Sequence, residues 1–193
     1  MLTSGIAWID AVFLTHDHAD HLNGLDDIRV FTWHRVMPFY AAADVCRQLR
    51  NRFSYIFGNP TPGGGVPNLD LQEMGPGGIT IGEMEILPVP IMHGQRIIRG
   101  YRIGTMAYLT DCSGIPSESY SLLQDLDVLI IGALRYRPHP THFSIDQAVA
   151  AAKTIGAKQT YLTHLCHDVE HSAVLQDLPA TVSPAYDGLT LEL

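Results

Sequence analysis

Short apolar runs alternate along this chain with segments whose apolar residues recur at helical spacing. The runs predict strands, and the continuous run at 127–131 is typical of a strand that is covered on both faces. The expected strands are residues 9–14, 37–41, 69–72, 84–89, 100–103, 106–110, 127–131 and 159–163. Because strands and helical segments alternate, the pattern favours an α/β fold over a helical bundle.

Two segments predict longer helices. Residues 42–56 carry several arginines on one expected helix face. The second helix is bounded by clearer signals, since Ser144 and Gln147 form a capping-box pair and Gly156 stands where a left-handed residue ends a helix. Between these helices, residues 58–78 are rich in glycine and proline and predict a loop that holds one short strand.

Length and composition limit the kind of protein. The 193 residues suit a single domain spanning residues 1–193, and 46% apolar content is too high for a disordered tail. The net charge of −8 disfavours a non-specific nucleic-acid binder. No apolar run is long enough for a membrane span, and three cysteines without a CxxC spacing indicate neither a disulfide framework nor a zinc ribbon. We therefore expect a cytoplasmic protein.

Three predicted strands end in a side chain that can bind a metal. The sequences are Leu14-Thr15-His16, Leu109-Thr110-Asp111 and Leu162-Thr163-His164. Since α/β folds place their sites at one edge of a sheet, where strands end, these three side chains are expected to converge there.

The segment 15–21 holds the densest group of candidate ligands. His16 and His18 are two residues apart, so they face the same way on an extended stretch. Asp20 and His21 follow where the chain turns into a helix, and they can point to a second position. Imidazole and carboxylate ligands suit zinc, manganese or iron, and the lack of thiolates argues against a structural zinc finger. The alternative is a solvated polar turn.

The segment 16–21 resembles the HxHxDH signature of the metallo-β-lactamase superfamily. That family also has a later histidine, an aspartate after a strand and a final histidine after another strand. His93, Asp111 and His164 occur here in that order and in that local setting. The resemblance implies the metallo-β-lactamase fold, an αββα four-layer sandwich with two mixed sheets.

The resemblance also implies seven metal ligands, in two sets that share one bridging carboxylate. The sets are His16, His18 and His93 for one ion and Asp20, His21 and His164 for the other, with Asp111 bridging them. The cofactors would be two divalent metal ions, manganese or zinc. A water that bridges two such ions loses a proton near neutral pH and would be the nucleophile. The ions would also make the site locally positive inside an acidic protein, as an anionic substrate requires.

Several patches look like the branch that contains the cyclic-ribose phosphodiesterase of the carbon–phosphorus lyase pathway. They are residues 21–29, 109–112, 140–144, 162–167 and 186–188. In that branch a further histidine contacts the phosphate, and His142 holds the matching place, where it would position the phosphate or protonate the leaving oxygen. The resemblance implies a phosphodiesterase on a small anionic substrate, a cyclic ribose phosphate or nucleotide.

Three other functions stay open. A tRNA 3′-end processing ribonuclease shares the metal ligands, but residues 58–78 contain no lysine or arginine and no basic arm is seen for a long RNA contact. A thiolester or lactone hydrolase of the same fold would cleave neutral acyl substrates and would tolerate replacement of His142. The third alternative is an inactive metal-binding fragment with a structural or regulatory role.

The start of the chain differs from the family pattern. Only fifteen residues precede His16, whereas members of this superfamily usually begin with several strands. We expect these first strands to be missing, through truncation or because Met1 is not the true start. A sheet edge would then be exposed, which favours a homodimer.

Overall fold

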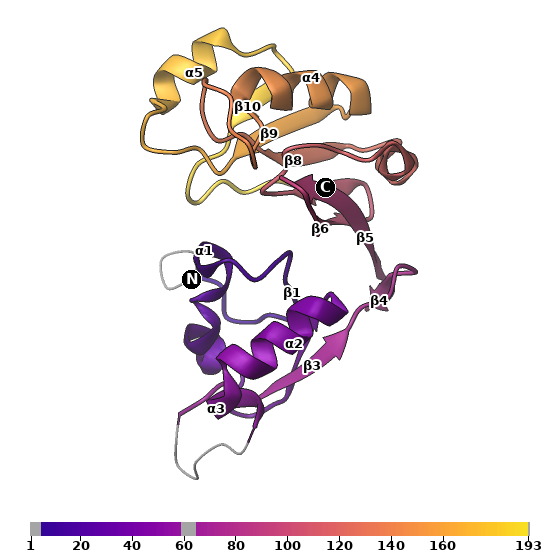
Figure 1. Ribbon diagram of the computed structural model, residues 1–193, viewed down its shortest axis with the longest axis vertical. Coiled ribbons are helices and arrows are strands. Elements are labelled where there is room, and N and C mark those ends of the chain that lie inside the picture. Colours follow the sequence, from indigo (N-terminus) through magenta and orange to yellow (C-terminus); the bar gives the residue numbers. More distant parts are fainter. Residues whose placement is uncertain (1–4, 59–64, 193) are drawn as a thin grey trace. The chain divides into compact units, whose positions relative to one another are not determined.

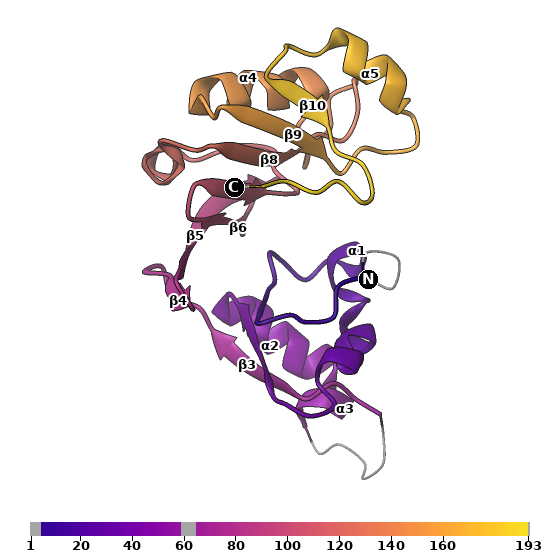
Figure 2. The same cartoon turned by 180° about the vertical axis from the view of Figure 1, so that it is seen from behind.

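The computed structural model describes residues 5–58 and 65–192. Its contacts divide the chain into two compact units, Met1–Gly82 and Glu83–Leu193, and each is described on its own (Figures 1 and 2). Helices and two sheets confirm the predicted α/β class. The single domain stays a prediction, and residues 59–64 of the predicted glycine- and proline-rich loop lie outside the described residues.

The first unit contains a parallel three-stranded sheet with the order β1-β2-β3. The strands are β1 (Val12–Phe13), β2 (Met37–Ala41) and β3 (Leu69–Glu73). The helices are α1 (Ala19–Leu22), the 3₁₀ helix η1 (Leu25–Phe31), α2 (Ala43–Arg52) and α3 (Ser54–Phe57). Apolar side chains of α2, among them Val45 and Leu49, pack with Leu14 and Phe39 into a buried core. This core fixes the end of β1, from which the candidate ligands follow.

The predicted helix at 42–56 is interrupted. At Phe53 the backbone has φ −117° and ψ 43°, which lies outside the helical region and separates α2 from α3. Arg52, the last residue of α2, donates a hydrogen bond from its guanidinium to the carbonyl of Asp17. The end of α2 therefore braces the ligand-rich loop that follows β1.

The second sheet is mixed and has the order β10-β9-β8-β7-β6-β5-β4. Its strands are β4 (Ile79–Ile81), which precedes the boundary between the units, β5 (Met84–His93), β6 (Arg96–Ile103), β7 (Met106–Leu109), β8 (Val128–Gly132), β9 (Gln159–Thr163) and β10 (Val182–Pro184). The pairs β5–β6 and β6–β7 are antiparallel, and β7, β8, β9 and β10 pair in parallel. The parallel strands β7, β8 and β9 thus end at the same edge, which holds two of the three predicted strand-end residues, Asp111 and His164. His16 follows β1, which belongs to the other sheet.

Helix α4 (Ile145–Ile155) forms between the predicted caps. The hydroxyl of Ser144 accepts from the backbone N–H of Gln147 at 3.3 Å, and the Gln147 side chain accepts from the N–H of Ser144 at 2.9 Å. Gly156 has φ +77° and ends the helix in the left-handed conformation. Figures 1 and 2 show α4 and α5 (His171–Asp177) on one side of β8, β9 and β10. Leu129 and Leu162 are fully buried in the core of this unit.

The strand β5 is longer than predicted, because its two prolines do not interrupt the pairing with β6. The N–H of Met92 points away from β6, to the carbonyl of Gly114 at 2.8 Å. Pro90 and Pro88 lie two and four residues before Met92, so their nitrogens also face away from β6 and no ladder hydrogen bond is lost. The strands β4 and β10 and the 3₁₀ helix η2 (Ser117–Leu123) were not predicted.

Among residues 5–58 and 65–192, no helix has the length and the apolar character that crossing a membrane requires.

Replacing Ser144 by alanine removes one half of the capping box of α4. We expect Ser144→Ala to lower the free energy of unfolding by about 1 kcal/mol. In a chain of this size the midpoint of thermal unfolding would fall by roughly 2–4 °C. Circular dichroism measures this shift. The matched control is Thr154→Ala on the same helix, because the exposed hydroxyl of Thr154 donates to the carbonyl of Ala150 within the helix and caps neither end. Equal shifts for both variants would show that the cap contributes nothing.

Candidate active site

The four predicted ligands of the first unit lie together in the loop and helix that follow β1. The His16 ring centroid is 4.5 Å from that of His18 and 4.4 Å from that of His21. Nε2 of His21 lies 3.2 Å from a carboxylate oxygen of Asp20. His16 is fully buried, whereas His18 and Asp20 are exposed. One short segment therefore brings three imidazoles and one carboxylate to one place.

Local backbone and hydrogen bonds orient this loop. His18 has an extended backbone, φ −70° and ψ 153°, directly before α1. The hydroxyl of Thr15 lies 3.0 Å from Nδ1 of His16. A ligating histidine commonly binds its metal through one ring nitrogen while the other makes a hydrogen bond that fixes the ring. Thr15 therefore fits the role of the residue that orients His16.

The second unit gathers the other predicted residues at the strand ends. His93 is the last residue of β5, Asp111 follows β7, and His164 directly follows β9. Nε2 of His164 lies 3.3 Å from a carboxylate oxygen of Asp111. The ring centroid of His142 is 4.9 Å from that of His93 and 5.2 Å from that of His164. His142 thus lies beside two predicted ligands.

Two of these residues have a backbone conformation that side chains other than glycine rarely adopt. Asp111 has φ +59° and His164 has φ +63°. Such conformations cost roughly 1–3 kcal/mol and persist at sites where the surrounding structure holds them. Gly132, which ends β8, allows this packing, because a Cβ there would lie 3.1 Å from the backbone nitrogen of Asp111. The strained backbone turns both side chains out at the ends of their strands.

A hydrogen bond sets the orientation of His93. Its Nδ1 lies 2.8 Å from the carbonyl of Thr141, which can only accept, so Nδ1 carries the proton and Nε2 offers a lone pair. Because Thr141 directly precedes His142, the same bond ties the loop that carries His142 to the end of β5.

The environment of His142 makes it a neutral imidazole. Burial lowers the pKa of His142 to about 4, although the charge of Asp111 opposes this shift. At neutral pH the ring therefore has one N–H donor and one acceptor nitrogen. Of the two predicted roles, holding a phosphate oxygen through the N–H requires only this neutral form.

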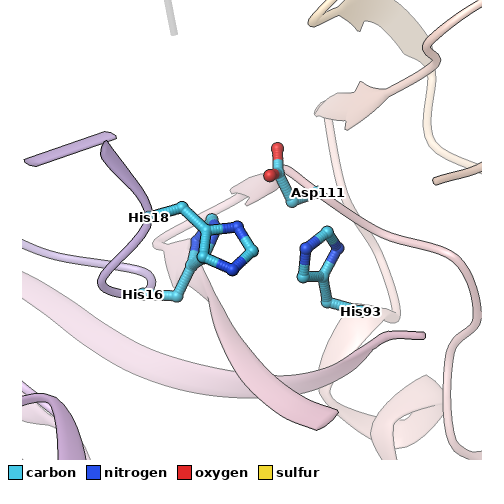
Figure 3. A group of neighbouring side chains, drawn as sticks. All are labelled: His16, His18, His93 and Asp111. Carbon is cyan, nitrogen blue, oxygen red and sulfur yellow. The ribbon is translucent and has the colours of Figure 1, made fainter. Parts of the chain in front are cut away.

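The donors in each unit suit a divalent cation. In the first unit, the ligand atoms of His16 and His18 lie within 4.8 Å of each other, as do those of Asp20 and His21. In the second unit, the same limit holds for His93 with Asp111 and for Asp111 with His164. Figure 3 shows the first two histidines on the loop of the first unit and His93 and Asp111 on the second. Imidazole and carboxylate donors together fit zinc or manganese.

His139 is not among the predicted site residues, yet its ring centroid is 5.0 Å from that of His142. In the sequence, His139 is marked only by its position three residues before His142. That spacing does not show whether the His139 ring contacts His142 or lies in solvent.

Comparison with known proteins gives one matching family and close relatives. The model of the β-lactamase superfamily domain matches residues 2–165. A solved diphosphatase from the PhnP family is 40% identical with a TM-score of 0.90, and the match covers 100% of this chain and 74% of that one. The metallo-β-lactamase fold protein YhfI from Bacillus subtilis is 22% identical with a TM-score of 0.74, over 94% of this chain and 76% of that one, which shows the fold alone.

A curated relative is longer than this chain. The octanoyltransferase of Porphyromonas gingivalis (strain ATCC BAA-308 / W83) is 42% identical over 192 residues, which are 97% of this chain and 39% of that protein. The chain therefore spans about two fifths of the length of this relative.

Substituting Asp111 tests the ligand assignment with little change in shape. Asp111→Asn keeps the side-chain volume and tolerates the left-handed backbone, but it removes the negative charge. We expect less metal per chain in elemental analysis of protein purified and dialysed with manganese or zinc, because an amide binds divalent cations more weakly than a carboxylate.

Asp125 offers a matched control, since it also has a left-handed backbone, at φ +54°. Asp125→Asn should keep the metal content of the unmodified chain. Equal metal content in the two variants would contradict a ligand role for Asp111.

Proposed function

Because this chain belongs to the metallo-β-lactamase superfamily, and within it to the PhnP family, we propose that this metal-dependent hydrolase cleaves a small phosphodiester. The proposed substrate is an anionic cyclic ribose phosphate or nucleotide. The proposal depends most on the position of His142. Its ring lies beside those of His93 and His164, and His142 is not itself a predicted metal ligand.

We propose that the donors of the two units together bind two divalent ions, manganese or zinc. The family match supports this, because residues 2–165 include every proposed ligand. The residues that would hold the ions are His16, His18 and His93 for one ion and Asp20, His21 and His164 for the other, and Asp111 would belong to both sets. When bound, such ions supply positive charge at the phosphoryl oxygens and a water that ionises near neutral pH.

The protein's own residues supply orientation and selectivity in this proposal. Thr15 and the carbonyl of Thr141 hold the rings of His16 and His93. Asp111 is almost fully buried, and its carboxylate would provide negative charge at the proposed position of the cations. The neutral imidazole of His142 donates its N–H to an oxygen of the substrate phosphate and holds the phosphorus in place.

Diphosphate hydrolysis is a second candidate, because the solved relative at 40% identity is a diphosphatase. A diphosphate differs from a diester in its leaving group, which is a phosphate rather than an alkoxide and needs less help from a proton donor. An acyl substrate is a third candidate, because the curated relative at 42% identity is an octanoyltransferase. This chain spans 39% of that protein.

Parallel assays of the metal-loaded chain distinguish these reactions. We expect cleavage of bis(p-nitrophenyl) phosphate and of a 2′,3′-cyclic nucleotide. Cleavage of a nucleoside diphosphate with release of inorganic phosphate, and of neither diester, would favour the diphosphatase. Hydrolysis of an octanoyl thioester alone would favour acyl chemistry and overturn the phosphodiesterase proposal.

Removing the imidazole of His142 separates chemistry from metal binding. We expect His142→Ala to keep the metal content of the unmodified chain while phosphodiester turnover falls by about 10²–10⁴. Elemental analysis and the bis(p-nitrophenyl) phosphate assay measure both in one sample. His171→Ala, an exposed histidine on α5, serves as the control and should leave both unchanged. Unchanged turnover in His142→Ala would remove His142 from the mechanism.

A further inference from the structure

The segment that joins β8 to α4 is a closed, positively charged loop. Residues 134–143 contain two arginines and two histidines and no acidic residue, in a chain whose net charge is −8. The N–H of Leu134 donates to the carbonyl of Phe143 at 2.9 Å, and the N–H of Ile145 donates to that of Arg135 at 3.0 Å. These bonds close the loop at its base, so its side chains have defined positions beside His142.

The two arginines of this loop differ in their partners. Arg137 pairs with Asp168, with 3.1 Å between Nη2 and the carboxylate oxygen. Arg135 is half-buried, and its Nε and Nη2 donate to the carbonyls of Arg137 and Pro138, at 3.4 Å each. Within residues 5–58 and 65–192, no carboxylate forms an ion pair with Arg135. Its charge is therefore held in place by neutral groups.

His139 presents a defined donor next to this charge. Its Nδ1 lies 3.4 Å from the backbone N–H and 3.2 Å from the hydroxyl of Thr141. Because a backbone N–H can only donate, Nδ1 is the acceptor and the proton of the neutral ring is on Nε2. Nη2 of Arg135 lies 3.4 Å from the carbonyl oxygen of Pro138, which directly precedes His139, so the guanidinium lies at this part of the loop.

We propose that Arg135, with the Nε2–H of His139, binds an anionic group of the substrate other than the phosphoryl group that is cleaved. This assignment rests on the proposed phosphodiesterase function and makes Arg135 a specificity-determining residue. The ring of His139 is 5.0 Å from that of His142, so one small molecule with two anionic groups can reach both. A guanidinium matches such a group, because its planar donors bind phosphate or carboxylate through two parallel hydrogen bonds.

The alternative role for Arg135 is mechanical. Its two hydrogen bonds to loop carbonyls could brace the loop that carries His142. Loss of a brace would impair every substrate equally, whereas loss of an anion site impairs only substrates that carry the second anionic group. A pair of substrates that differ in this group alone therefore separates the two roles.

The test compares two chromogenic diesters, thymidine 5′-(p-nitrophenyl phosphate) and its 3′-phosphorylated counterpart, on the manganese-loaded chain. The unmodified chain should show a KM about 10–100-fold lower for the phosphorylated diester, as expected for a charge-assisted hydrogen-bonded pair. Arg135→Ala should bring the ratio of the two KM values close to one, and Arg135→Lys should restore part of it. Arg137→Ala, the matched control on the same loop, should keep the ratio.

Two results would overturn the proposal. One is a ratio near one in the unmodified chain, and the other is an unchanged ratio in Arg135→Ala, which would assign Arg135 to the mechanical role.

A binding measurement keeps this inference distinct from the proposed function. Calorimetry of the manganese-loaded chain with thymidine 3′,5′-bisphosphate and with thymidine 5′-phosphate requires no turnover. Tighter binding of the bisphosphate that is lost in Arg135→Ala would support the anion site even if no diester were cleaved, and only the phosphodiesterase proposal would then fail. The opposite result would overturn the anion site alone. In that case both diesters are cleaved, and Arg135→Ala changes neither the ratio of the KM values nor the preference for the bisphosphate in binding.

Discussion

The second unit depends on the way in which its parallel strands end. Asp111 and His164 both leave their strands in the left-handed conformation, at φ +59° and φ +63°. Gly132, at the end of the strand between them, leaves room for the backbone of Asp111. Each strained residue costs about 1–3 kcal/mol, which the buried core beneath must offset. This conformation brings together side chains that follow β7 and β9, on either side of β8, with 3.3 Å between Nε2 of His164 and a carboxylate oxygen of Asp111.

The loop before α4 connects His93, a proposed metal ligand, with the residues that would hold the substrate. The carbonyl of Thr141 accepts from His93, while the N–H and the hydroxyl of the same residue contact His139. His142 comes next in the chain and lies against His93 and His164. The caps of α4 begin at Ser144, so the helix fixes the far end of this loop. The proposed selectivity of Arg135 follows from the same closed loop.

Much of this arrangement could be predicted from the sequence, since it depends on local signals. The caps of α4 and the strand ends before Asp111 and His164 are patterns within a few residues, and the structure has both where they were predicted. The third residue, His16, follows β1, which belongs to the other sheet rather than to the predicted common edge. The full length of β5 was not predictable, because Pro88 and Pro90 interrupt a strand pattern unless their nitrogens face away from the neighbouring strand. The sequence does not distinguish Arg135 from Arg137, because the two arginines differ in a distant partner: Arg137 pairs with Asp168, 31 residues further along the chain.

The central claim is that metal bound by these histidines and aspartates drives hydrolysis of a phosphodiester. The most direct measurement titrates manganese or zinc into the metal-free chain and records bound metal and bis(p-nitrophenyl) phosphate cleavage in the same samples. We predict no cleavage without metal and a rise that saturates near about two ions per chain. Full metal loading without cleavage of a phosphodiester, or equal cleavage by the metal-free chain, would contradict the account.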